Sequence, residues 1–147
     1  MCRSPYCEYM FRRMVEESDI LRGKVEVKSS AVMSPVPAID PNTAEALIRE
    51  GFDREYVNSH KPGFILRPYD WKLFREADII IGMTKGHKLL LPVWWHKKFK
   101  TLSEAATGKY APVPDPWLIR DIDKYIVEMN KIKAFLLQYK DCLEKQL

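Results

Sequence analysis

The sequence has few cysteines, no long apolar run and no strong excess of charge. Its three cysteines, at positions 2, 7 and 142 of 147 residues, form neither a closely spaced metal-binding pair nor the dense set of a disulfide-stabilised domain. Apolar runs such as IIIGM and LLLPVWW are far shorter than the roughly 20 residues that span a bilayer. The first residues contain no apolar signal segment. We therefore expect a cytoplasmic protein with reduced thiols and no membrane partner.

Charge and composition narrow the possible partners. The net charge is +4, and lysine and arginine are spread along the chain rather than gathered in one run. This distribution argues against nucleic acid and suits a small anionic substrate. With 46% apolar and 12% aromatic residues, the chain has enough material for one buried core, so we expect residues 1–147 to form a single domain.

Hydrophobic periodicity predicts helices alternating with strands. Apolar positions recur at helical spacing after Pro5, and this first helix is expected to end near Asp19. Residues 24–32, KVEVKSSAV, alternate like a strand, and the apolar run DIIIGM at 78–83 is typical of a central parallel strand. This alternation indicates an α/β domain with a parallel sheet. Further helices are expected after the N-cap Asp40, around YDWKLFREA, over about 85–93 and over 119–146, with FKTLSEA as a weaker strand candidate.

Two short motifs near the ends of the chain suit phosphate chemistry. CRSP reads as the end of a loop and the start of a helix, with Ser4 as the N-cap and Pro5 in the first turn. PDPW lies in a proline-rich loop before the last helix. Between these motifs come SSA, IDPNTAEAL, GFDREYVNSHKPG and ADIIIGM. In this order and spacing, the segments resemble the low-molecular-weight protein tyrosine phosphatase family, whose active loop has the form C-x-G-N-x-C-R-S-P and whose acid lies in a late D-P-[YW] loop.

The resemblance implies a fold and a reaction. The fold is a flavodoxin-like three-layer αβα domain with a parallel sheet of strand order 2-1-3-4. The reaction is the hydrolysis of a phosphomonoester through a cysteinyl phosphate, without metal or cofactor. Substrates of this class are a phosphotyrosyl protein or a small phosphomonoester, and the site also binds phosphate-like anions.

The family's site residues fall on particular positions of this sequence. Arg3 matches the arginine that holds two phosphate oxygens, a task suited to a planar guanidinium. Cys2 and Ser4 belong to the phosphate-binding loop, and the Ser4 hydroxyl is placed to steady the departing thiolate. Asp115 matches the general acid, which afterwards activates water. Trp117 matches an aromatic residue that walls the substrate pocket, although simple packing explains it nearly as well.

The three histidines match the family pattern less closely than Arg3 and Asp115 do. His60 matches a family histidine that, together with Ser30, buttresses the phosphate loop, and a surface position is an equal alternative. His87 and His96 match no motif and are expected to be exposed.

The nucleophile is absent from these residues. The family pattern CX5R places it six residues before the arginine, and six before Arg3 falls ahead of Met1. Cys2 corresponds to the second, non-nucleophilic cysteine of the loop. Cys7 fits CX5R with Arg13, but the intervening EYMFR lacks glycine, carries an acid and reads as helix, where the N–H groups are already used. We therefore expect Cys7 to be a core residue and the 147-residue polypeptide to be inactive.

Two explanations for the missing nucleophile stay open. In one, the protein starts about ten residues earlier, enough for a short strand and half a loop. In the other, the chain is degenerate and either rearranges or borrows a strand, with association of copies through unpaired strand edges. In both, the first and central strand is missing from the chain.

Two other functions use a scaffold of this kind. A noncatalytic oxyanion-binding or interaction module on the same scaffold would bind anions without turnover. Arsenate reductases of this fold need two further cysteines after the third strand, and residues 84–95 contain none.

Overall fold

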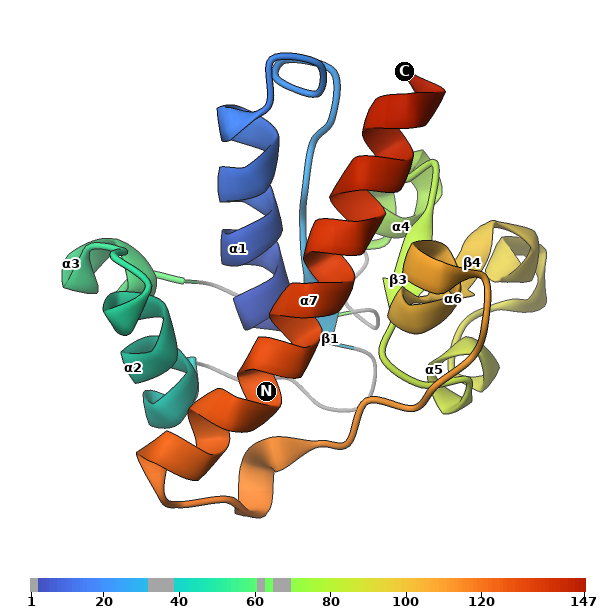
Figure 1. Ribbon diagram of the computed structural model, residues 1–147. Coiled ribbons are helices and arrows are strands. Elements are labelled where there is room, and N and C mark those ends of the chain that lie inside the picture. Colours follow the sequence, from blue (N-terminus) through green and yellow to red (C-terminus); the bar gives the residue numbers. More distant parts are fainter. Residues whose placement is uncertain (1–2, 32–38, 61–62, 65–69) are drawn as a thin grey trace.

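The computed structural model describes residues 3–31, 39–60, 63–64 and 70–147. Helices and short strands alternate along the chain (Figure 1). The α-helices are α1 (Arg3–Glu17), α2 (Pro41–Arg49), α3 (Arg54–Asn58), α4 (Trp71–Glu76), α5 (Gly86–Leu89), α6 (Leu102–Thr107) and α7 (Ile122–Gln146). The strands are β1 (Ser30–Ala31), β2 (Gly63–Phe64), β3 (Ile80–Gly82) and β4 (Phe99–Thr101), and two 3₁₀-helices are η2 (Val93–Lys98) and η3 (Pro116–Leu118).

Side-chain caps set several helix starts. The Asp40 carboxylate accepts hydrogen bonds from the backbone N–H groups of Asn42 and Thr43 at 3.0 and 3.3 Å, which confirms the predicted start of α2. Asp121 caps α7 in the same way. Helix α1 begins at Arg3. The prediction of Ser4 as its N-cap was therefore wrong, because Ser4 lies inside the first turn.

Two helices were missed by the sequence analysis. Helix α3 lies in a stretch for which no element was predicted, and its N-cap Asp53 accepts a hydrogen bond from the N–H of Tyr56 at 3.1 Å. Helix α6 begins with a capping box, in which Thr101 and Glu104 bond each other's backbone N–H groups at 3.2 and 3.3 Å. The sequence TLSE carries that signal, Ser or Thr followed by Glu three residues later.

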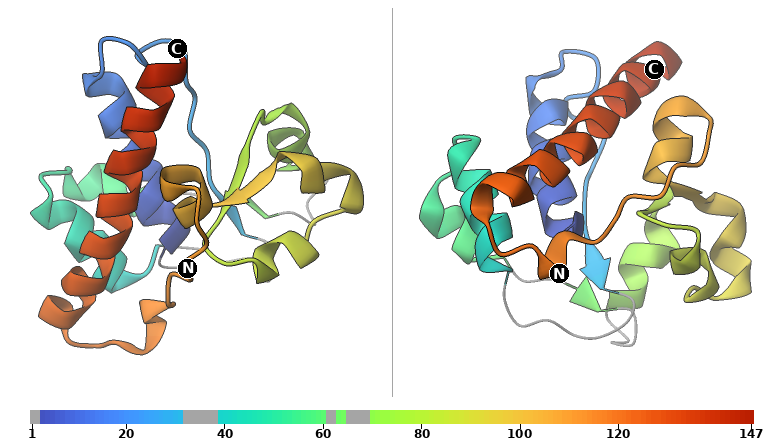
Figure 2. Two further views of the ribbon diagram at one scale, coloured as in Figure 1. Left: turned by 45° about the vertical axis from the view of Figure 1, so that its right-hand side comes forward. Right: turned by 60° about the horizontal axis from the view of Figure 1, so that its bottom comes forward.

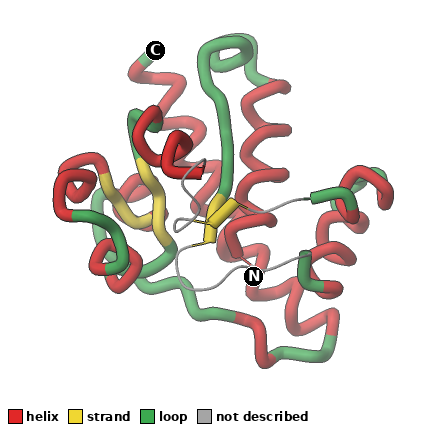
Figure 3. The backbone as a smooth tube through the Cα atoms, turned by 180° about the vertical axis from the view of Figure 1, so that it is seen from behind, coloured by secondary structure: helices red, strands yellow, loops and turns green. Residues whose placement is uncertain are grey.

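The described strands pair in parallel, which confirms an α/β fold with parallel pairing. Ser30 pairs with Gly63 in one pair, and Ile80 pairs with Phe99 in the other. The two pairs are separate two-stranded sheets in the described chain (Figure 3). Whether a further strand lies between them stays a prediction.

The prediction of a strand over residues 24–32 was wrong in length. Only Ser30 and Ala31 are assigned to β1, while residues 25–29 have no regular structure. A strand is defined by hydrogen bonds to a neighbour, so an alternating pattern alone does not produce one. Val25 and Val27 nevertheless pack against the main core, which accounts for the alternation.

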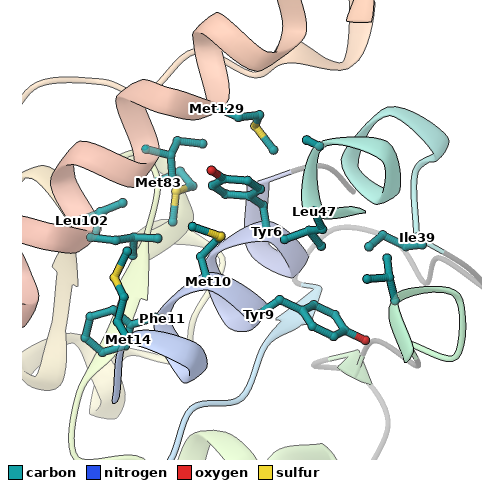
Figure 4. Close-up of a cluster of buried hydrophobic side chains, with 14 of the residues drawn as sticks. Tyr6, Tyr9, Met10, Phe11, Met14, Ile39, Leu47, Met83, Leu102 and Met129 are labelled. Atoms are coloured by element: carbon teal, nitrogen blue, oxygen red, sulfur yellow. The ribbon is translucent and has the colours of Figure 1, made fainter. Parts of the chain in front are cut away.

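The main core lies between α1, α2 and α7 (Figures 1 and 4). Side chains from α1, including Tyr6, Met10 and Met14, meet Leu47 of α2 and Met129 of α7 there. A second, smaller cluster joins Phe74 of α4 to Leu91 and Trp95. In the parts of the chain that the structure describes, no helix combines the length and apolarity needed to cross a membrane.

Candidate functional site

Arg3 and Asp115 form the center of the candidate site. Arg3 Nη2 lies 3.6 Å from Asp115 Oδ2, and Arg3 Nη1 donates to the backbone carbonyl of Val113 at 2.6 Å. The side chain of Arg3 is 13% exposed, whereas that of Asp115 is 44% exposed. The first turn of α1 thus lies beside the segment leading into η3, and both views of Figure 2 show the start of α1 beside this segment. A cation and a carboxylate from opposite ends of the sequence therefore share one site.

The other predicted loop residues are described only in part. Ser4 is half-buried one position after Arg3. Cys2 lies outside the described residues, as does the side chain of Trp117, whose backbone belongs to η3. The roles assigned to Cys2, Ser4 and Trp117 stay predictions.

Glu8 of α1 is buried at the center of a polar network. It accepts hydrogen bonds from Arg12 at 2.6 Å and from the Ser29 hydroxyl at 2.8 Å. Its Oε2 also lies 3.3 Å from His60 Nδ1, and the side chains of Glu8 and His60 are only 8% and 7% exposed. Arg12 additionally donates to the carbonyl of Val27 and to the Tyr56 hydroxyl, both at 3.0 Å. The network ties α1 to the segment that enters β1.

This network decides between the two expectations for His60. A surface position was wrong, because the ring is buried and Nε2 has no hydrogen-bond partner among the described residues. Burial lowers the pKa of His60, and the negative charge of Glu8 opposes that shift. The predicted support of the phosphate loop by Ser30 and His60 stays a prediction, since no hydrogen bond of either residue to Arg3 or Ser4 is found and Cys2 lies outside the described residues. Glu8 was not predicted to belong to this network. The signal in the sequence is an acidic residue on the apolar side of a predicted helix.

The expectation that His87 and His96 are exposed was wrong, because both are half-buried. His87 Nδ1 accepts a hydrogen bond from the N–H of Met83 at 3.1 Å, and His96 Nε2 lies 2.9 Å from the carbonyl oxygen of Leu91. Burial lowers the pKa of His87, with Arg3 acting in the same direction and Asp115 opposing it. His87 of α5 therefore lies near enough to the candidate site for the charges of Arg3 and Asp115 to act on it.

Gly82 allows Phe99 of β4 and His87 of α5 to lie close to the end of β3. A Cβ at Gly82 would lie 2.6 Å from Phe99 Cζ and 3.0 Å from His87 Cβ. Any side chain there would push β4 or α5 away, which explains the glycine at the end of β3.

Cys7 is part of the core side of α1, as expected. It packs against the main core, and burial raises the pKa of its thiol to about 12, with a small opposing effect of Arg3. Because the thiolate is the reactive form, we expect a thiol reagent at pH 8 to modify Cys7 about a thousandfold more slowly in the folded protein than in urea, from the rise of 9.0 to about 12. Peptide mass spectrometry measures this ratio. Equal rates in the two states would contradict the burial of the thiol.

A cavity lies away from this site. It has a volume of about 460 Å³ and lies between α2 and α7, lined by Tyr6, Arg49, Glu50 and Lys133 among others. Glu50 is held there by Lys133 at 2.9 and 3.0 Å and by Arg13 at 3.4 Å. Its charge is thereby neutralised, and neither Arg3 nor Asp115 lines this cavity. In the described ranges, no group of three His, Cys, Asp or Glu side chains is arranged as metal ligands.

Comparison with known proteins now gives the family. The family model described as "Low molecular weight phosphotyrosine protein phosphatase" matches residues 1–147. The chain belongs to this family. The resemblance carried by CRSP and the late DPW segment is therefore confirmed at the level of the family. No curated protein matches the sequence at the similarity that we required.

Solved structures agree with this assignment. The crystal structure of a YwlE mutant from Bacillus subtilis is 27% identical, with a TM-score of 0.81, covering 97% of this chain and 91% of that one. The solution structure of a low molecular weight protein tyrosine phosphatase from Bacillus subtilis is 28% identical, with a TM-score of 0.79 and coverage of 98% and 91%. A mutant of the YwlE arginine phosphatase with a phosphorylated active-site serine is 28% identical, with a TM-score of 0.82 and coverage of 98% and 90%.

Proposed function

We propose that this chain carries the arginine and acid half of a phosphomonoester hydrolase site. The observation that carries the proposal is the 3.6 Å separation between Arg3 and Asp115, within a chain that matches a phosphatase family from end to end. An arginine alone is a common surface residue. An arginine that is 13% exposed and adjoins an acid from the late DPW segment is the pairing that phosphoryl transfer to a cysteine requires.

In the complete site, each residue has a task. A cysteine thiolate attacks phosphorus while the bond from phosphorus to the leaving oxygen breaks, and Asp115 gives its proton to that oxygen. The ionised Asp115 then takes a proton from water, which attacks the cysteinyl phosphate and releases phosphate and the thiolate. The guanidinium of Arg3 binds two equatorial oxygens throughout, and the Ser4 hydroxyl stabilises the thiolate. The mechanism requires no metal or cofactor.

We propose that none of the three cysteines in these 147 residues supplies that thiolate. Cys2 matches the second cysteine of the family loop, and Cys7, with a pKa of about 12 inside α1, is not a substitute. We therefore propose that a polypeptide of these residues binds oxyanions without turnover. The alternative is that anion binding is itself the function, in a noncatalytic module. The proposed substrate is a phosphotyrosyl protein or a small phosphomonoester. Phosphoarginine is a further candidate substrate, because one similar structure is that of an arginine phosphatase.

Titration calorimetry with phosphate and orthovanadate tests the oxyanion site. We expect the parent chain to bind both and Arg3→Ala to lose at least about tenfold in affinity, since a charge-assisted hydrogen bond contributes about 1.5–3 kcal/mol. Asp115→Asn is expected to bind more tightly, because the carboxylate no longer competes with the anion for Arg3. Arg22→Ala is the matched control, since Arg22 is exposed and pairs only locally with Asp19. Absence of binding by the parent would contradict both the enzyme and the module.

We also propose that residues 1–147 act as one domain in the cytoplasm. The main core supports the first part, because it joins residues from Tyr6 to Leu136. We further propose that copies of the chain associate through strand edges, which β1 and β3 support because each pairs with one described neighbour.

A further inference from the structure

The surface formed by α5 and η2 has an unusual concentration of exposed apolar side chains. Leu89, Val93 and Trp94 are 82%, 76% and 64% exposed. Leu90 and Trp71 are exposed as well, and the rings of Trp71 and Trp94 both contact the Trp95 ring, with centroids 5.5 and 6.2 Å away. We call Trp71, Leu89, Leu90, Val93 and Trp94 the apolar patch. Exposed apolar clusters of this kind mark interaction sites.

The patch is held in shape by its own underside. Leu91 and Trp95 point inward to Phe74, onto which the Trp95 ring stacks at 5.4 Å. The bond between His96 and the Leu91 carbonyl closes the turn at 2.9 Å, and Lys98 Nζ donates to the carbonyls of Arg75 and Ala77 at 3.1 and 2.8 Å. A surface fixed in this way loses little conformational entropy on binding.

The segment that carries α5 and η2 has charge of one sign. Residues 84–100 contain five lysines and neither aspartate nor glutamate. Lys85, Lys88 and Lys97 are exposed beside the apolar side chains, whereas Lys98 is occupied by the end of α4. A partner that fits this surface combines bulky apolar side chains with negative charge.

The N-terminal end of α5 lies beside the segment that leads to Asp115. The backbone N–H of Lys85 donates a hydrogen bond to the Tyr110 hydroxyl at 3.3 Å, and the Lys85 ammonium lies 4.6 Å from the center of the Tyr110 ring. Tyr110 begins the segment that leads to Asp115, and Figure 1 shows α5 at the same lower end of the molecule as this segment. A chain bound at Arg3 and Asp115 therefore has the patch within reach.

We propose that the apolar patch and its lysines bind an acidic, apolar segment flanking the phosphorylated residue of a protein substrate. This inference rests on the proposed function, since it names the part of the substrate outside the phosphate group. A second copy of the chain fits less well, because two identical patches would bring lysines against lysines. An anionic bilayer also fits less well, because a bilayer lying on α5 would cover the end where Arg3 and Asp115 meet.

The test uses an unphosphorylated peptide that contains glutamate, leucine and tryptophan, so that the oxyanion site is not involved. Fluorescence anisotropy with the 147-residue chain is expected to show binding that weakens with added salt, and at least tenfold weaker binding for Lys88→Glu combined with Lys97→Glu. Trp94→Ala with Leu89→Ala is expected to weaken binding to a similar extent. Lys124→Glu and Val127→Ala are matched controls, because both residues are exposed on α7, and they should leave the affinity unchanged.

Further measurements separate this inference from the proposed function. Arg3→Ala should retain peptide binding while losing phosphate binding. The oxyanion site and the apolar patch are therefore tested independently. Unchanged affinity in the lysine or Trp94 variants would overturn the inference, as would equal binding of a peptide with glutamine in place of glutamate. Tighter binding to phosphatidylserine vesicles than to the peptide, or self-association through the patch in sedimentation, would also overturn it.

Discussion

Hydrolysis of p-nitrophenyl phosphate should appear when a strand-forming segment ending in Cys-x-Gly-Asn is added directly before Met1. Met1 then occupies the variable position before Cys2, and the new cysteine stands six residues before Arg3. We expect activity to rise from background by several orders of magnitude, because enzymes lower such barriers by about 8 kcal/mol or more. The physical reason is that Arg3 and Asp115 already lie 3.6 Å apart and lack only an attacking thiolate. Initial rates of p-nitrophenol release measure the effect.

Two controls make this result interpretable. The same extension with serine in place of the new cysteine should be inactive, and the extended Asp115→Asn variant should lose most of its turnover because the leaving oxygen is no longer protonated. Rates of phosphate release by the extended chain from phosphotyrosine and phosphoarginine peptides show which of the two is the substrate. Turnover by the 147-residue polypeptide itself, unaffected by Asp115→Asn, would contradict both the mechanism and the missing nucleophile.

The largest loss of stability is expected at Glu8. Glu8→Ala removes the shared partner of Arg12, Ser29 and His60, which leaves Arg12 without its carboxylate and a buried imidazole without the acceptor at its Nδ1. Breaking a buried ion pair in this way costs about 3–5 kcal/mol, which for a domain of this length lowers Tm by roughly 10 °C. Thermal unfolding followed by circular dichroism measures the difference.

Two further variants at this network show whether charge or shape matters. Glu8→Gln keeps the volume and one acceptor oxygen, so it should lose less, about 1–3 kcal/mol. Glu16→Ala, on the exposed side of the same helix, should change stability by less than about 0.5 kcal/mol. If Glu8→Ala and Glu16→Ala had equal effects, the network would not stabilise the fold.

Local chemistry explains where sequence reasoning succeeded. Asp40 followed by Pro41 predicted the start of α2, because a cap acts within three residues of its own position. The long amphipathic pattern over 119–146 likewise predicted α7, observed over Ile122–Gln146. Both signals depend on neighbours in sequence, and no distant partner was needed to interpret them.

Strands were predicted less well, because their hydrogen bonds come from distant segments. KVEVKSSAV alternates as a nine-residue strand would, yet only Ser30 and Ala31 pair, with Gly63 and Phe64. The same limitation applies to the histidines. The sequence around His60 and His87 contains nothing to show that one is buried against Glu8 and that the other accepts a hydrogen bond from Met83.

The sequence by itself determined the family and the residue types for phosphate chemistry, because CRSP and DPW are short motifs whose chemistry is local. Only the tertiary structure brought Arg3 to Asp115, buried Glu8 with His60, and left the apolar patch exposed beside its lysines. Those outcomes depend on how α1, α5 and the segment before η3 pack in space, and packing joins residues whose separation along the chain carries no information about their distance.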